Sequence, residues 1–323
     1  MENNREGPAW RRGNVTTLAG GVGAAKLLAG LVETVDPSNV TIIANTGDDI
    51  DLHGLRICPD IDTVVYTLAG VVDPERGWGI RDDSFECLKW LDRYGAPAWF
   101  NLGDRDLATH IRRTSRLAER ASLSQVTEEM TRALGVKARV FPMTDSYAPT
   151  MIRTEEGRMH LQEYFVRRRC EPSIRSIEYQ DIERARPAPG VLESIAGTDL
   201  IIVCPSNPFI SIGPILAVPG VREALVQTNA SIAAVSPIVG GRAIKGPAAA
   251  MLRDLGFEVS AAAVARMYRD FVQVFVLDQT DAALAPLVED MGMRALVTNT
   301  IMESQADKRA LAEVILNAAM KAL

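Results

Sequence analysis

Two stretches near the start of the chain constrain the fold most, because each is a short apolar run that ends abruptly in a polar or glycine-rich loop. The first, 14–31, reads NVTTLAGGVGAAKLLAGL, and the second, 40–51, reads VTIIANTGDDID. In the first stretch a β-branched run gives way to glycines, and leucines then recur at helical spacing. This pattern predicts strand, glycine loop, helix and second strand, with polar loops outside the carboxyl ends of the strands, where open α/β sheets bind ligands.

Later apolar runs repeat the pattern and predict further buried parallel strands. The run at 199–204 ends in Pro-Ser-Asn-Pro, and the run at 231–236 ends in a glycine-rich loop. Strand-like segments at 272–277 and 295–298 and a helix at 303–322 follow. We therefore expect an α/β fold with a Rossmann-like, doubly wound and mostly parallel sheet.

The remaining segments divide the chain into three expected parts. Helical patterns without a clear strand fill 82–135 and predict a helical insertion, whereas 14–81 and 136–323 form the α/β core. Residues 1–13 are polar and predict a disordered tail. Three smaller predictions are a loop at 52–59, a hairpin at 150–166 and a helix-capping role for Asp60.

Composition narrows the possible partners and the compartment. The 323 residues carry 41 acidic and 35 basic side chains, a net charge of −6 that argues against a nucleic-acid scaffold. The four cysteines form no C-x-x-C pair, so neither a zinc site nor a disulfide framework is expected. Since no signal peptide or membrane-spanning apolar run is visible, the sequence predicts a cytoplasmic protein.

The glycine loop after the first strand is a candidate phosphate site. Gly20, Gly21 and Gly23 lack Cβ atoms, so a phosphate can approach the backbone N–H groups at the positive end of the helix dipole. Lys26 adds a mobile positive charge. The loop matches neither G-x-x-x-x-G-K-[ST] nor a full G-x-G-x-x-G, so a plain glycine-cornered turn with a solvated lysine is the alternative.

Carboxylates gather after the second strand and point to a divalent cation. Asp48, Asp49, Asp51, Asp60 and Asp62 fall within one loop-helix passage. Carboxylates placed this close together repel one another unless a cation intervenes, and carboxylate oxygens are the ligands that Mg²⁺ prefers. The sequence therefore predicts bound Mg²⁺.

Seven ordered motifs together resemble one family, the 2-phospho-L-lactate transferases (CofD/FbiA) of coenzyme F-420 biosynthesis. The resemblance covers nearly the whole chain from residue 15 onward. The motifs are LAGGVGAAKLLAGL at 18–31, NTGDD at 45–49, PDIDTVVYTLAG at 59–70, RGWGIRDD at 76–83, LGDRDLATHIRR at 102–113, PSNPFISIGPILAVPG at 205–220 and SPIVGG at 236–241.

The resemblance implies a reaction, a set of ligands and a homodimer. A phospho-acid moves from an acid-diphospho-5'-guanosine donor to the deazaflavin acceptor 7,8-didemethyl-8-hydroxy-5-deazariboflavin (Fo), giving the F-420-0 precursor and GMP. The donor's acid, whether lactyl, enolpyruvyl or glyceryl, stays open, and no nucleic acid or membrane takes part. Asp49 and Asp62 are the implied catalytic and Mg²⁺-binding residues, and Asp62 acts either as a metal ligand or as the base for the acceptor hydroxyl.

The implied ligand-binding residues fall into three sets. The glycine loop with Lys26 holds the donor phosphates, and Ser206 with Asn207 holds the nucleotide. Trp78, Asn101, Gly103 and Asp104 are assigned to the acceptor, and Thr63 is a further ligand-binding residue without an assigned ligand. The alternative is a non-catalytic, nucleotide-sugar-binding regulator of the gluconeogenesis-factor type, but the DDID and PDIDT segments favour the transferase.

Overall fold

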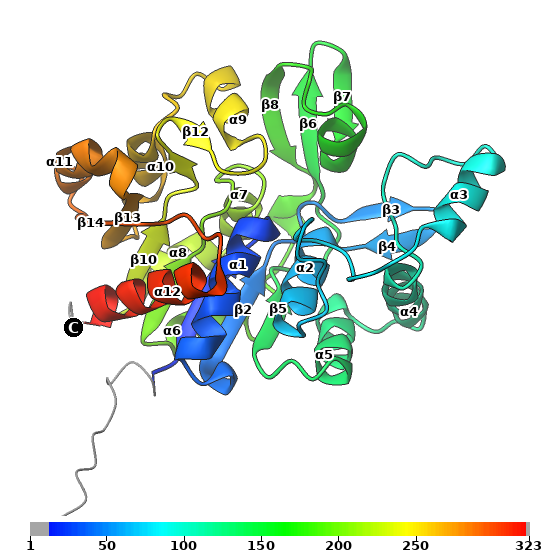
Figure 1. Cartoon of the computed structure of the whole chain (residues 1–323), viewed down its shortest axis with the longest axis horizontal. Coiled ribbons are helices and arrows are strands. Elements are labelled where there is room, and N and C mark those ends of the chain that lie inside the picture. The colour runs from blue at the N-terminus through cyan, green and yellow to red at the C-terminus, as the bar shows by residue number, and fades with distance from the viewer. Residues whose placement is uncertain (1–12, 321–323) are drawn as a thin grey trace, which may run out of the picture.

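The computed structural model describes residues 13–320, so the predicted disordered tail at 1–13 lies outside them apart from Gly13. Its centre is a seven-stranded sheet in the order β14-β13-β10-β9-β1-β2-β5 (Figure 1). The strands are β1 (Val15–Ala19), β2 (Val40–Ala44), β5 (Arg139–Pro142), β9 (Leu200–Val203), β10 (Ser231–Val235), β13 (Val274–Asp278) and β14 (Arg294–Thr298).

Every neighbouring pair in this sheet is parallel, which confirms the predicted α/β, doubly wound architecture. The strand order runs outward in both directions from the β1–β9 pair, since β2 and β5 follow on one side and β10, β13 and β14 on the other. The topological switch point therefore lies between β1 and β9, and a crevice is expected outside their carboxyl ends.

Helices cover both faces of the sheet because its strands are apolar on both sides. In β9, Leu200 and Ile202 pack on the first face, whereas Ile201 and Val203 pack on the second. The first face is covered by α1 (Gly21–Thr34), α2 (Pro59–Leu68), α5 (Leu123–Ala133) and α12 (Gln305–Met320). The second is covered by α6 (Val191–Ala196), α7 (Ile212–Ala217), α8 (Val221–Gln227), α10 (Ala261–Tyr268) and α11 (Ala285–Glu289).

The segment predicted as a helical insertion contains α3 (Glu86–Arg93), α4 (Asp106–Ala118) and α5. Next to it lies a hairpin of β3 (Ile50–Leu52) and β4 (Leu55–Ile57), where we predicted only a loop at 52–59. The hairpin forms because its apolar residues pack against this segment. Ile50 and Ile57 share a small core with Leu102 and Leu107.

Asp83 and Asp104 cap two neighbouring helices in exchange: each aspartate caps the helix that follows the other one. Asp104, which precedes α4, accepts hydrogen bonds from the N–H groups of Glu86 (3.0 Å) and Cys87 (2.9 Å) at the start of α3. Asp83, which precedes α3, accepts from the N–H groups of Arg105 (2.8 Å) and Asp106 (3.0 Å) at the start of α4. This exchange satisfies orphan N–H groups of both helices and ties them together.

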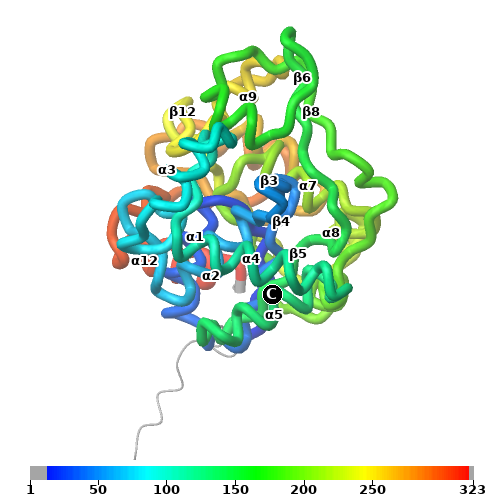
Figure 2. Tube along the Cα trace, turned by 90° about the vertical axis from the view of Figure 1, so that its right-hand side faces the viewer, coloured from blue at the N-terminus to red at the C-terminus, as the bar shows by residue number. Residues whose placement is uncertain are grey.

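A second, antiparallel sheet of β6 (Thr150–Thr154), β7 (Gly157–His160) and β8 (Ile174–Tyr179) stands beside α9 (Ala248–Asp254) in both views (Figures 1 and 2). Asp254 accepts a 2.8 Å hydrogen bond from the Ile174 N–H. The predicted hairpin is confirmed at 150–160, but its second strand ends there, since Glu163–Arg167 forms a π-helical turn.

The remaining elements are short. They are the β11 (Ile238–Val239) and β12 (Arg242–Ala243) ribbon and 3₁₀ turns at Pro37–Asn39, Ile182–Arg184 and Gln279–Leu284. Within residues 13–320, no helix combines the length and the apolar character needed to span a bilayer.

Candidate functional site

The loops after β1 and β9 touch each other at the switch point. The Ser206 hydroxyl donates a 2.8 Å hydrogen bond to the Gly20 carbonyl. A Cβ atom on Gly23 would lie 2.4 Å from the carbonyl oxygen of Pro205, so only glycine fits there. Asn207 instead stabilises the turn of its own loop, because its Oδ1 accepts a hydrogen bond from the Phe209 N–H at 2.9 Å. The structure thus brings the predicted glycines and Ser206 together.

Asp60 does not cap its own helix, so that prediction was wrong. The N-cap residue of α2 is Cys58, which makes no side-chain capping bond. Asp60 instead accepts from the Gly21 N–H of α1 at 2.7 Å and from the Asn45 side-chain amide at 2.8 Å. Because α2 begins beside the start of α1, the carboxylate reaches the neighbouring helix terminus.

This contact changes how the glycine loop can bind an anion. The Gly21 N–H is occupied, and a Cβ atom on Gly20 would lie 2.6 Å from Asp60 Oδ2. Among residues 13–320, the N–H groups of Val22 and Gly23 have no acceptor outside the helix. They remain available for a phosphate.

Burial raises the pKa values of three carboxyl groups at this edge. It raises the pKa of Asp60 to about 6, against the hydrogen bonds from Asn45 and Gly21. It raises the pKa of Asp49 to about 8 and that of Asp48 well above its usual range, where Asp60 and Asp49 add repulsion. Without a cation, some of these three carboxyl groups are therefore protonated and neutral at pH 7.

Asp49 has one carboxylate oxygen available. Its Oδ2 accepts a hydrogen bond from the buried Cys58 thiol at 3.0 Å, whereas its Oδ1 is buried without a hydrogen-bond partner. A buried unpaired oxygen is costly in a protein interior. Oδ1 therefore suits a cation or a ligand donor.

Asp62 lies in a separate buried group with residues of α4. Arg113, whose side chain is 0% exposed, binds both carboxylate oxygens of Asp62, with Nη1 3.1 Å from Oδ2. His110 Nδ1 is 3.7 Å from Asp62 Oδ2, and His110 Nε2 is 3.4 Å from Asp106 Oδ2. Burial raises the pKa of the Tyr66 phenol, which donates to Asp106 at 2.7 Å.

Ligand atoms of Asp62, Asp106 and His110 lie within 4.8 Å of one another, which is close enough to share a metal ion. Arg113 already supplies a positive charge to Asp62, so a cation at this position competes with the guanidinium. Asp49 is not part of this group of ligand atoms.

The other predicted residues have mixed environments. Lys26 Nζ donates to the Met302 carbonyl at 3.0 Å. Thr63 is buried beside Asp62 in the first turn of α2, and Asn101 is exposed. The ring of Trp78 lies 5.3 Å from the Arg76 guanidinium. Gly103 admits the Asp83 carboxylate, whose Oδ2 would lie 2.1 Å from a Cβ atom there, so Gly103 and Asp104 have structural roles in the capping exchange.

Sequence reasoning missed the roles of Asn45, Asp60 and Arg113. A signal for Arg113 exists, since it follows His110 by three residues and both therefore project from one side of α4. Nothing in the sequence alone identifies Asp62 of α2 as the partner of Arg113 and His110.

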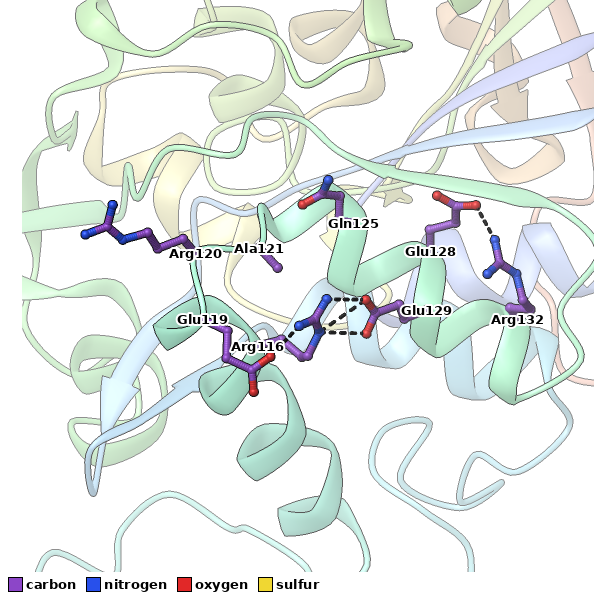
Figure 3. A pocket seen from close by; sticks show the side chains of 8 residues that line it. All are labelled: Arg116, Glu119, Arg120, Ala121, Gln125, Glu128, Glu129 and Arg132. Atoms are coloured by element: carbon purple, nitrogen blue, oxygen red, sulfur yellow. Dashed lines mark hydrogen bonds and ion pairs between the residues drawn. The ribbon is translucent and has the colours of Figure 1, made fainter.

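A polar hollow of about 420 Å³ lies between α4 and α5 (Figure 3), and none of the site residues described above lines it. Its charges neutralise one another. Arg116 pairs with Glu119 and Glu129, and Arg132 pairs with Glu128 (Figure 3). These pairs include every charged side chain that lines the hollow except Arg120.

The fold and the loops at the switch point define a class, that of doubly wound α/β proteins whose crevice lies outside the carboxyl ends of parallel strands. Two solved structures of one Bacillus halodurans protein, described as a member of the upf0052 family, share this fold. They align with TM-scores of 0.66 and 0.64 at 16% identity, each covering 94% of this chain and 99% of that chain.

The family model described as 2-phospho-L-lactate transferase CofD matches residues 15–315. A protein named 2-phospho-L-lactate transferase from Methanothermobacter thermautotrophicus is 41% identical over 95% of this chain and 98% of its own length. A protein named phosphoenolpyruvate transferase from Streptomyces griseus is 43% identical over 89% and 92%, respectively. The chain belongs to the CofD family of transferases, as the seven motifs predicted.

Proposed function

We propose that this protein transfers a phospho-acid from an acid-diphospho-5'-guanosine donor to the deazaflavin acceptor Fo and so forms the F-420-0 precursor. The acceptor hydroxyl oxygen forms a bond to the phosphorus that carries the acid. The bond from that phosphorus to the bridging oxygen breaks, GMP leaves with the electron pair, and the hydroxyl proton passes to a base. Such a transfer requires positioning and charge neutralisation above all.

The contact between the loops after β1 and β9 is the observation that carries this proposal. The hydrogen bond from the Ser206 hydroxyl to the Gly20 carbonyl joins the two loops at the switch point. The N–H groups of Val22 and Gly23 remain for a phosphate. Names of relatives supply the chemistry: both a 2-phospho-L-lactate transferase and a phosphoenolpyruvate transferase match over most of the chain.

Mg²⁺ fits one of the two predicted ligands better than the other. Asp49 offers the unpartnered oxygen Oδ1 next to Asp48, and a bound cation would ionise both carboxyl groups and neutralise donor phosphates. Both oxygens of Asp62 already accept from Arg113, so a metal or a proton at Asp62 would have to share this carboxylate with the guanidinium charge. In the geometry observed, Asp62 positions α4 through Arg113.

The test is a turnover assay with Fo and the lactyl, enolpyruvyl and glyceryl donors, each alone and in competition. GMP release and the mass of the deazaflavin product are measured with Mg²⁺ and with EDTA. We expect product from at least one donor, with Mg²⁺ required. Stable binding of a uridine nucleotide sugar, without affinity for guanine nucleotides or Fo, would instead favour the regulator.

A further inference from the structure

Two lysines from distant parts of the sequence lie near the glycine loop, close enough for the charge of Lys26 to affect Lys245. Lys26 lies in the second turn of α1, and Lys245 lies in the loop between β12 and α9. Lys245 Nζ donates to the Arg76 carbonyl at 2.7 Å, and Lys26 Nζ donates to the Met302 carbonyl at 3.0 Å. Each ammonium group is thus held by a backbone oxygen from another segment.

A third segment connects Lys245 to the glycine loop. Gly77 has a positive φ of 76°, and a Cβ atom built on it would lie 2.7 Å from Val22 Cγ1 and 3.6 Å from Lys245 Nζ. The loop at 73–81 therefore packs directly on the start of α1, with the Lys245 ammonium group beside it. Glycine is required at 77 both by its backbone conformation and by this close approach.

Neither lysine has an acidic partner among the residues that the structure describes. No ion pair within 13–320 includes Lys26 or Lys245, although many arginines of this chain are paired with carboxylates. An ammonium group has three donors, and one hydrogen bond each leaves two donors on either lysine. Partial burial, and then the charge of Lys26, lower the pKa of Lys245. Two ammonium groups that lack carboxylate partners and lie within electrostatic range of each other favour an anion.

We propose that Lys26 and Lys245 together bind a diphosphate, with Lys245 as a ligand-binding residue of this site. Asp60 occupies the Gly21 N–H, so these lysines add positive charge beside the N–H groups of Val22 and Gly23, which stay available. That this diphosphate belongs to the guanosine donor rests on the proposed function. The anion site itself rests on the two lysines.

The test is calorimetric titration with inorganic pyrophosphate, GDP and GMP. We expect Lys26→Met and Lys245→Met each to weaken pyrophosphate and GDP binding roughly ten- to a hundredfold, the usual effect of losing a hydrogen bond to a charged group. GMP binding should change less. Lys245→Arg should retain most of the affinity. Lys137→Met is the control, since Lys137 is exposed at the opposite end of the strands, just before β5.

A second readout follows protons. Because the pKa of Lys245 is lowered and a bound anion raises it, the parent should take up more protons than Lys245→Met does when pyrophosphate binds at alkaline pH. Titrations in buffers of different ionisation enthalpy measure that uptake, which should shrink in Lys245→Met. If Lys245 only held the Arg76 carbonyl and did not bind the anion, its replacement would leave this proton uptake unchanged.

The outcomes separate this proposal from the transferase. If Lys245→Met binds pyrophosphate and GDP as the parent does, or if the parent binds no pyrophosphate, the lysine site is refuted whether or not turnover occurs. If lysine-dependent pyrophosphate binding is found while the guanosine donors give no product, the anion site stands and the proposed reaction fails.

Discussion

Replacing Arg113 by methionine should destabilise the protein far more than replacing an arginine on its surface. The Arg113 side chain is fully buried and binds both oxygens of Asp62, whose side chain is 7% exposed. The substitution leaves a buried carboxylate without its counter-charge. We expect the free energy of unfolding to fall by about 3–5 kcal/mol.

The adjacent Arg112 provides a matched control. Its side chain is 60% exposed and lies 3.4 Å from Glu129, so Arg112→Met should cost about 0–1 kcal/mol. The assay is urea denaturation at neutral pH, followed by circular dichroism, with the urea dependence of each variant compared. Equal losses in Arg113→Met and Arg112→Met would refute the buried-pair reasoning.

A double variant identifies the cause of the loss. Asp62→Asn removes the carboxylate charge, so Arg113→Met combined with Asp62→Asn should be more stable than Arg113→Met alone by about 2 kcal/mol. Additive losses would show that Arg113 acts by packing and not by neutralising Asp62. Asp62→Asn alone leaves the buried Arg113 guanidinium without its counter-charge, so this single variant should also lose stability.

Four further predictions concern stability, donor choice and assembly. Asp49 has a pKa of about 8 when folded against 3.8 unfolded, so the folded state holds the extra proton and stability should fall as pH rises from about 4 to about 8; Asp49→Asn should flatten this fall in EDTA. Asp104→Ala removes hydrogen bonds that cap α3, so it should lower the free energy of unfolding by about 1 kcal/mol in the same denaturation assay. Asp92→Ala is the control and should leave the free energy of unfolding unchanged. In competition assays more than one donor should react, since a pocket senses one small group by only ~1–3 kcal/mol; exclusive use of one donor would contradict this. Light scattering should show the homodimer that the family resemblance implies, and a monomer would refute it.

The alternation of apolar strands and helices was readable from the sequence because each buried parallel strand must be apolar on both faces. The runs at 15–19, 40–44 and 200–203 needed no knowledge of their partners to be recognised. The hairpin at 50–57 was missed, since its strands are three residues each and their burial depends on packing against Leu102 and Leu107, far along the chain.

The sequence by itself determined that glycines, carboxylates and Ser206 follow the central strands, which places them at one edge of any parallel sheet. Only the tertiary structure decided which carboxylate meets which partner. Asp60 reaches α1, and Asp62, two residues later in the same helix, faces Arg113. Successive helical residues point about 100° apart, so two aspartates of one motif face different neighbours once α1 and α4 have packed beside α2.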